Sequence, residues 1–337
     1  MKRFVRLAAL ALVISLATRT ALAETEVTTV LEGLTNPTGI AIQPETGDVF
    51  IADSGALKVI RVVDGQAQDV ITGFTKDVYG KGPMFDIGPL GLAFIDKDTL
   101  VVGDGGKPDG EEQLLVYTVP AKGEAAIAAD KSKFSFTLPA TDDIKGEGNF
   151  YGVAVNASGI FVTCNGDDTK GWVAKADING TKVDNFRRFI ATKEATGVDA
   201  PVAITISPRG EVVVGQMGEI NVPEDGLLTF YNAKSGEKLL NVKTGLYDIT
   251  GLAYSPKGQL YAVDFAWMDT TKGGLFQLIA EKKDGEQSLK TEKLASLDKP
   301  TALAFGKDGS LYITVIGTAQ EGKEQPSGKL LKVAPGL

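Results

Sequence analysis

Residues 36–42 (NPTGIAI) and 47–54 (GDVFIADS) form a unit that the chain repeats. Each copy has a short apolar strand with a small residue at its third position, a tight turn and a second apolar strand. The small residues recur at spacings of 52, 61, 51, 48 and 51 residues: Gly39, Gly91, Gly152, Ala203, Gly251 and Ala302. Glycine or alanine at this position lets the first strands of neighbouring units approach each other closely.

A third strand is expected after each pair, at 57–63, 114–119, 172–178, 227–231, 275–279 and 330–333. A fourth follows in five units, at 69–73, 134–138, 186–190, 239–242 and 293–295. The sixth unit ends after its third strand, and residues 26–31 at the other end of the chain resemble the missing one. The sequence predicts an all-β, six-bladed β-propeller with four-stranded antiparallel blades and 3+1 closure by the N-terminal strand. A β-solenoid is a poorer interpretation of a period near 50 residues with four strands in each unit.

The first unit resembles an NHL repeat, and residues 25–337 as a whole resemble the NHL-repeat, gluconolactonase and strictosidine-synthase-like propellers. The resemblance implies the fold rather than one activity, because this fold carries enzymes and inert scaffolds alike. Several other propeller enzymes of this kind depend on histidine, among them quinone-dependent sugar dehydrogenases. This chain has no histidine, so an imidazole base or a histidine-bound metal is excluded.

Residues 1–23 have the features of a secretory signal peptide, with a basic start, an apolar run at 7–17 and the ALA cleavage motif at 21–23. The apolar run is too short to span a bilayer, so an uncleaved membrane anchor is the lesser alternative. Residues 24–337 are expected to form one domain, without a membrane span, in the periplasm or outside the cell.

The net charge of the whole chain is −8, and the leader contributes four basic residues and no acidic one. The remaining domain therefore carries −12, which disfavours nucleic-acid binding. Cys164 is the single cysteine, so an internal disulfide is impossible. Its place at the end of an apolar run predicts a buried hydrophobic residue rather than a nucleophile.

The long connections fall on one face of the predicted propeller, and they contain more apolar residues than is usual for loops. One interpretation is packing between blades. The other is a hydrophobic mouth over the central channel that accepts a small apolar molecule or a protein segment. The contacts expected in that mouth are Phe85, Tyr151, Met217, Phe265, Trp267 and Met268.

Acidic residues also occur on this face, but carboxylates scattered over loops are usually solvated. Asp53, Asp104 and Asp264 end equivalent second strands. Their repetition predicts a structural role, in which each caps backbone N–H groups of the following loop.

The gluconolactonase resemblance implies a calcium ion in the channel, held by Asn or Asp just before the small residue of several inner strands. The equivalent positions here carry other residues, namely Thr38, Leu90, Tyr151, Val202, Thr250 and Thr301. Asn36, Asn149 and Asp248 would come into play only if the register slipped by two residues. We therefore predict no metal, no cofactor and no catalytic residue.

The sequence favours an exported binding or interaction module rather than an enzyme. A hydrolase or lactonase of the gluconolactonase-like group, working without histidine, is the first alternative. A structural module of the cell envelope is the second.

Overall fold

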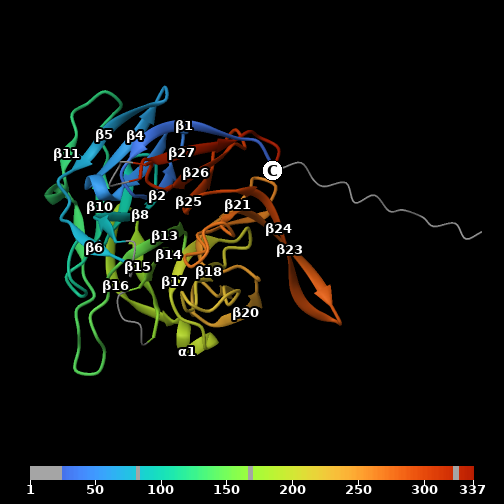
Figure 1. Ribbon diagram of the computed structural model, residues 1–337. Helices are drawn as coiled ribbons and strands as arrows, with labels where there is room; N and C mark the ends of the chain where they lie inside the picture. The colour runs from blue at the N-terminus through green and yellow to red at the C-terminus, as the bar shows by residue number, and fades with distance from the viewer. Residues whose placement is uncertain (1–24, 81–83, 166–169, 322–325) are drawn as a thin grey trace, which may run out of the picture.

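The computed structural model describes residues 25–80, 84–165, 170–321 and 326–337. The predicted leader, residues 1–23, lies outside these ranges. The described chain forms a six-bladed β-propeller of four-stranded antiparallel sheets (Figure 1). None of its helices is long and apolar enough to cross a membrane.

Each blade runs outward from an inner strand that lines the central axis. Blade 1 consists of β2 (Pro37–Ile42), β3 (Val49–Asp53), β4 (Lys58–Val63) and β5 (Gln66–Thr72). Blade 2 consists of β8 (Pro89–Phe94), β9 (Thr99–Asp104), β10 (Leu114–Thr118) and β12 (Phe134–Phe136). Blade 3 consists of β13 (Phe150–Asn156), β14 (Gly159–Cys164), β15 (Trp172–Asn179) and β16 (Lys182–Ala191).

The second half of the ring repeats this order. Blade 4 consists of β17 (Pro201–Ile206), β18 (Val212–Gln216), β19 (Leu227–Tyr231) and β20 (Lys238–Lys243). Blade 5 consists of β21 (Ile249–Tyr254), β22 (Leu260–Asp264), β23 (Gly274–Lys283) and β24 (Glu286–Ser296). Blade 6 consists of β25 (Pro300–Phe305), β26 (Leu311–Val315), β27 (Gly328–Val333) and β1 (Val27–Leu34).

The predicted 3+1 closure is confirmed, because β1 lies antiparallel to β27 as the outer strand of blade 6. The pairing runs from Val27 opposite Val333 to Leu34 opposite Gly328. It satisfies the outer edge of β27 and joins the two ends of the chain in one sheet.

The inner strands contact one another around the ring because small residues let them do so. A Cβ atom added to Gly39 would lie 2.0 Å from the carbonyl oxygen of Leu90 in the next blade. The same addition to Gly91 would lie 2.5 Å from the carbonyl oxygen of Tyr151. The small residue of the repeat is therefore required by the close approach of neighbouring blades, as the sequence predicts.

The hydrophobic core is divided between the blades. Buried side chains gather into six clusters in the described chain, each at the junction of two neighbouring blades. Between blades 1 and 2, for example, Phe50 and Val59 pack with Leu100 and Val102. A seventh cluster lies elsewhere, over the axis at one end of the channel.

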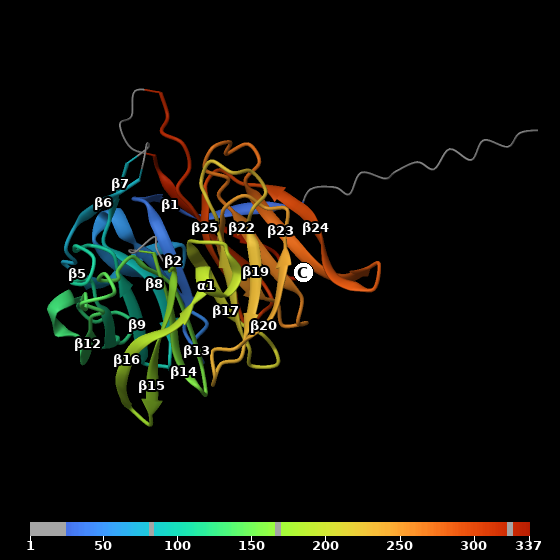
Figure 2. The ribbon, with the colours of Figure 1, turned by 90° about the horizontal axis from the view of Figure 1, so that it is seen from below.

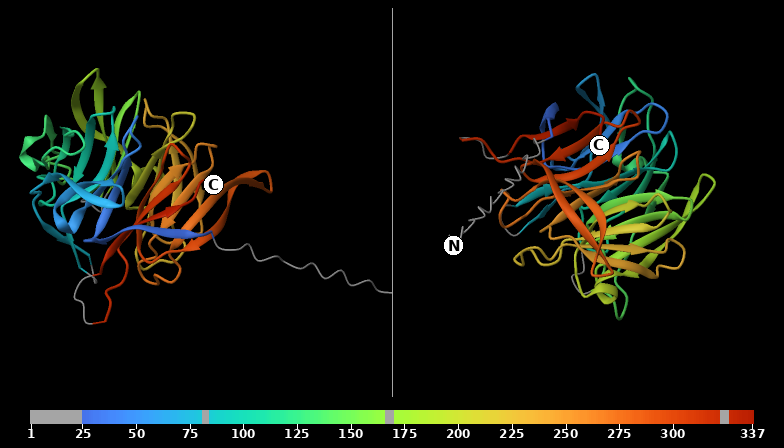
Figure 3. Two further views of the ribbon diagram at one scale, coloured as in Figure 1. Left: turned by 90° about the horizontal axis from the view of Figure 1, so that it is seen from above. Right: turned by 90° about the vertical axis from the view of Figure 1, so that its right-hand side faces the viewer.

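Four features go beyond the predicted blades. The hairpin of β23 and β24 extends well past the rest of blade 5 and projects from the body in Figures 1 and 3. Strands β6 (Asp77–Tyr79) and β7 (Phe85–Ile87) pair within the long connection between blades 1 and 2. Strand β11 (Ile127–Ala128) pairs parallel to β5, and α1 (Thr192–Thr196) follows β16.

Candidate ligand pocket at the mouth of the channel

The second residue of each inner strand faces the axis at one end of the channel. These residues are Thr38, Leu90, Tyr151, Val202, Thr250 and Thr301, and all six line one pocket. The pocket opens on the face that carries the long connections, and we call it the mouth pocket. Figure 2 shows strands β6 and β7 and the red segment of residues 316–321 on the same side of the ring.

The threonine hydroxyls of this ring are used to join neighbouring blades. Thr250 Oγ1 donates to the carbonyl oxygen of Pro300 at 2.8 Å, and Thr301 Oγ1 donates to that of Pro37 at 2.7 Å. Thr38 Oγ1 lies within 3.3 Å of two carbonyl oxygens at the start of β8. Each hydroxyl therefore bonds to the inner strand of the next blade rather than pointing freely at the axis.

Tyr151 crosses the channel. Its hydroxyl donates to the carbonyl oxygen of Thr301 at 3.1 Å. Tyr151 is in blade 3 and Thr301 in blade 6, which are opposite each other in a ring of six, so the side chain spans the axis. Burial raises the pKa of the Tyr151 hydroxyl, which keeps it protonated as a hydrogen-bond donor.

A second set of residues forms the wall above this ring. The residue directly after the second strand lines the pocket in blades 3 to 6: Asn165, Met217, Phe265 and Ile316. The β6–β7 hairpin contributes Tyr79, Phe85 and Ile87 from one side, and Trp267 comes from the other. The seventh cluster therefore joins side chains from blades far apart in the sequence.

Trp267 is the centre of the aromatic packing. Its ring stacks on Phe265 with centroids 5.0 Å apart and an interplanar angle of 25°. Phe85 and Tyr79 pack against the Trp267 indole in edge-to-face geometry, with ring centroids 5.8 and 6.4 Å from that of Trp267. Offset stacking and edge-to-face contacts are the favourable arrangements for aromatic pairs, so Trp267 is held in one orientation.

Two buried carboxylates, Asp248 and Asp264, fix the backbone at and around Trp267. Asp248 accepts a hydrogen bond from the backbone N–H of Trp267, and Asp264 accepts from those of Tyr247, Asp248 and Ala266. Burial raises the pKa of Asp248 to about 7, and the neighbouring Asp264 adds to the rise. Burial also raises the pKa of Asp264.

The predicted capping of the following loop is confirmed for Asp104 and Asp264 and is wrong for Asp53. Asp104 accepts from Gly106 N and Asp264 from Ala266 N, both in the loop that follows the strand. Asp53 instead accepts from Thr35 N, which precedes the inner strand of its blade. Burial raises the pKa of Asp53 and of Asp104 to about 6.

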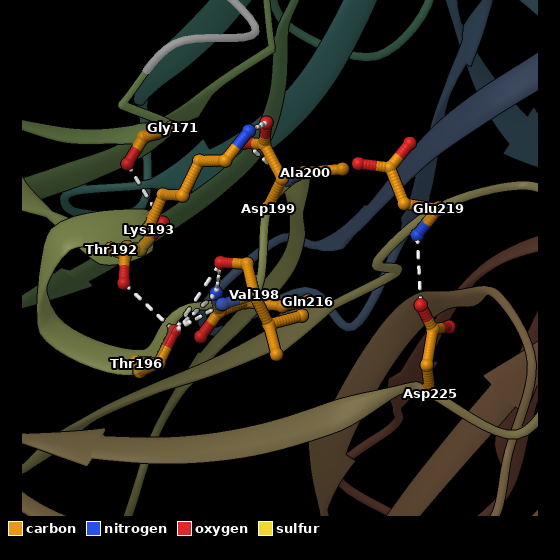
Figure 4. Close-up of polar contacts among 10 residues, drawn as sticks. All are labelled: Gly171, Thr192, Lys193, Thr196, Val198, Asp199, Ala200, Gln216, Glu219 and Asp225. Carbon is orange, nitrogen blue, oxygen red and sulfur yellow. Dashed lines mark hydrogen bonds and ion pairs between the residues drawn. The ribbon is translucent and has the colours of Figure 1, made fainter. Parts of the chain in front are cut away.

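Gln216 takes the equivalent position in blade 4 and uses its amide. Its Nε2 atom donates to Thr196 Oγ1 at 3.1 Å and to the carbonyl oxygen of Val198 (Figure 4). The next residue, Met217, donates its N–H to the carbonyl oxygen of Ala200. This network fixes the chain where Met217 enters the pocket wall.

Glu112 fixes the backbone of Asn149, another residue of the mouth pocket. The Glu112 carboxylate is buried and accepts a hydrogen bond from Asn149 N at 2.8 Å. Burial raises the pKa of Glu112 to about 9, and Asp109 and Asp104 add to the rise. Asn149 has a left-handed backbone with φ of 45° and lines the mouth pocket.

The structure brings five of the six predicted contact residues together. Phe85, Tyr151, Met217, Phe265 and Trp267 all line the mouth pocket. Met268 does not line the pocket, and the residue is 68% exposed. Met84 lies next to Phe85 and is 56% exposed. Whether any of these residues contacts a ligand stays a prediction.

Sequence reasoning missed Asn165 and Ile316, and it named Phe85 without predicting the β6–β7 pairing that brings Phe85 to the wall. Asn165 and Ile316 follow Cys164 and Val315, which end the second strands of their blades. Alignment of the six units at that position would have found them. The thiol of Cys164 is buried in the core between blades 2 and 3, as predicted, and burial raises its pKa.

The residues of the channel do not fit a calcium ion. Calcium takes six to eight oxygen ligands. The threonine hydroxyls bond to carbonyl oxygens, Leu90 and Val202 have no side-chain oxygen, and Tyr151 reaches across the axis. In the described chain, no group of three or more acidic or cysteine side chains is placed to hold a metal.

The register slip considered from the sequence also fails to collect ligands. Asn36 and Asn149 do line the mouth pocket. Asp248 does not line this pocket, and its carboxylate accepts from Trp267 N. The amide oxygens of Asn36 and Asn149 alone are far fewer than the six to eight oxygens that calcium takes.

Comparisons with known proteins show the fold. No protein-family model and no curated protein matches the chain. Solved structures do match it, and they include PQQ-bound aldose sugar dehydrogenase from Streptomyces coelicolor, with a TM-score of 0.61 at 14% identity. That match covers 93% of this chain and 99% of the other.

A gluconolactonase from Xanthomonas campestris has a TM-score of 0.58 at 14% identity, covering 94% of this chain and 92% of the other. A glucose dehydrogenase has a TM-score of 0.61 at 14% identity, with 92% and 100% covered. At such identities the similarity concerns architecture. The chain is a six-bladed β-propeller of the kind found in gluconolactonase and sugar dehydrogenase structures.

Proposed function

We propose that the mouth pocket binds a small, uncharged and mainly apolar group. The observation that carries the proposal is its lining, which contains aromatic, aliphatic, threonine and asparagine side chains. Among the described lining residues there is no Asp, Glu, Lys or Arg. A charged ligand would be desolvated there without an ionic partner, whereas an apolar one gains from burial.

The size of the cavity supports a shallow mode of binding. The mouth pocket has a volume of about 80 Å³. Sites that enclose a whole drug-sized molecule usually measure roughly 300–1,000 Å³. The pocket therefore suits one end of a small molecule, or one apolar side chain of a protein segment. The remainder of the ligand would rest on the rim beside Met84 and Met268.

Trp267 provides the test, because the chain has only one other tryptophan, Trp172. In a Trp172→Phe background we expect 1-butanol and γ-butyrolactone to change Trp267 emission saturably. Phe265→Ala removes the ring stacked on Trp267 and should weaken binding about tenfold, or about 1.4 kcal/mol. Trp267→Phe is the control for unspecific signals. Emission unchanged by any concentration of these ligands would contradict the proposal.

Hydrolysis of a lactone is the second candidate function, and the comparisons favour it over a pure binding module. Among the described residues, the pocket lining offers no carboxylate that would act as a base. A pH-stat assay with glucono-1,5-lactone tests this candidate in calcium and in chelator. A rate above the uncatalysed one, lost on mutation of Asn149, supports it. A rate equal to the buffer blank removes it.

We further propose that the protein acts outside the cytoplasm. The support is the leader at residues 1–23. N-terminal sequencing of the protein from fractionated cells should find Glu24 as the first residue, in the periplasm or the medium. Full-length protein confined to the cytoplasm would contradict export.

A further inference from the structure

Tyr151 separates two cavities on the axis. The mouth pocket lies on one side of it, and a funnel of about 370 Å³ lies on the other. Tyr151 lines both cavities, as do the short side chains of Thr38 and Thr250. The wall of the funnel is formed by the small residues of the repeat and their neighbours on the inner strands.

Among the second residues of the six inner strands, Tyr151 alone has a side chain long enough to cross the axis. The other five positions carry Thr, Leu or Val. The three threonines are fixed against the next blade by their hydroxyl bonds. The Tyr151 ring is fixed at its far end by the 3.1 Å bond to the carbonyl oxygen of Thr301. Tyr151 is therefore the side chain that crosses the barrier between the cavities, which the fixed side chains of Thr38 and Thr250 also border.

The backbone tolerates a shorter residue at this place in the repeat. Val202 is the equivalent residue of blade 4, and Gly152 and Ala203 follow the two in matching positions. Removal of the Tyr151 phenol group would leave the arrangement of the six inner strands intact. It would join the mouth pocket to the funnel.

We propose that Tyr151 determines ligand length by acting as a crossbar at the bottom of the mouth pocket. The inference rests on the proposed binding of an apolar group at the mouth. It assigns Tyr151 as the residue that limits how deeply this group enters, so that ligands longer than the pocket gain nothing from their extra length.

The test is a series of 1-alkanols from ethanol to 1-octanol, titrated against Trp267 emission in the Trp172→Phe protein. In the parent protein we expect Kd to fall with chain length until the pocket is filled, and then to stay constant. In Tyr151→Val the fall should continue into the funnel, by up to about fourfold for each added methylene group. Tyr151→Ala is the second variant, for the case in which the valine protein does not fold.

Two controls separate depth from volume. Tyr151→Phe keeps the ring across the axis and should keep the parental length limit. Ile316→Ala enlarges the mouth pocket at its wall, since Ile316 lines that pocket but not the funnel. It should not move the length limit.

The outcomes distinguish this inference from the proposed function. Alkanol binding with the same length limit in parent and Tyr151→Val overturns the crossbar and leaves the mouth pocket as a ligand site. A limit moved equally by Ile316→Ala also overturns it. Binding of longer alkanols by Tyr151→Val supports the crossbar. Absence of binding in every protein overturns the ligand site and the crossbar together.

Discussion

At the scale of single residues, short polar side chains have structural tasks around the axis. Thr250 and Thr301 connect the inner strands of neighbouring blades through hydroxyl-to-carbonyl bonds. Thr163, on the second strand of blade 3, bonds to the inner strand of blade 4, donating to the carbonyl oxygen of Val202 at 2.8 Å. Inner strands have a free edge toward the channel, so these bonds satisfy carbonyl groups that no sheet partner reaches.

Asp248 leads to a prediction about pH. Its pKa is raised from 3.8 to about 7 in the folded protein, mainly by burial. The folded state therefore binds a proton that the unfolded state has already released between pH 4 and pH 7. The stabilisation from the neutral carboxyl group is complete below about pH 4 and is lost as the pH rises through 7.

Asp248→Asn should therefore stabilise the protein more at pH 8 than at pH 5, relative to the parent. The asparagine is neutral at both pH values and keeps an oxygen that accepts from Trp267 N. Urea unfolding at the two pH values measures the difference. An equal effect of the substitution at both would contradict the raised pKa.

The mouth pocket was predictable from the sequence only in part. Phe85, Phe265 and Trp267 could be placed on the loop-rich face because aromatic residues are unusual in long connections. The bond from Tyr151 to Thr301 could not be predicted, because it joins residues 150 positions apart across the ring. Met268 follows Trp267 in sequence but points away, a difference that depends on local backbone geometry.

At the scale of elements, the repeat predicted inner and second strands well and outer strands less well. Second strands are buried on both faces, so their apolar runs are continuous. The outer parts of β23 and β24 are exposed, and their sequence lacks that signal. The sequence analysis did not predict this hairpin, although the Asp284-Gly285 pair at its turn, with φ of 54° and 89°, is a sequence signal for one.

The closing strand gives a prediction at this scale. Deletion of residues 24–33 removes most of β1 and exposes the edge of β27, so the protein should unfold or form oligomers. Size-exclusion chromatography and a thermal melt measure the effect. The matched control deletes 282–283 and 286–287, which shortens the projecting β23–β24 hairpin by two residue pairs, so the Asp-Gly turn again joins a hydrogen-bonded pair. It should melt close to the parent.

A monomer with an unchanged melt after loss of residues 24–33 would mean that the ring does not depend on β1. Failure of both deletions would mean that the effect is not specific to closure.

At the scale of the whole molecule, the ring has an axis with two distinct ends. One end is a small mouth pocket under aromatic side chains, and the other is a wider funnel. The propellers of similar architecture include gluconolactonase and sugar dehydrogenase structures, so the shared fold accommodates different chemistry. In this chain Tyr151 and hydrogen-bonded threonines occupy the axis. We infer that the channel holds no calcium ion.

Calcium dependence of the thermal melt tests that inference most directly. The melt is recorded in chelator and in 1 mM calcium at matched ionic strength. An ion bound only by the folded state adds about 2.7 kcal/mol at a concentration of 100 Kd, which would raise Tm. We expect the same Tm in both conditions. A rise with calcium that Asn36→Gly or Asn149→Gly abolishes would contradict it, because these variants keep the left-handed backbone but lose the amide oxygen.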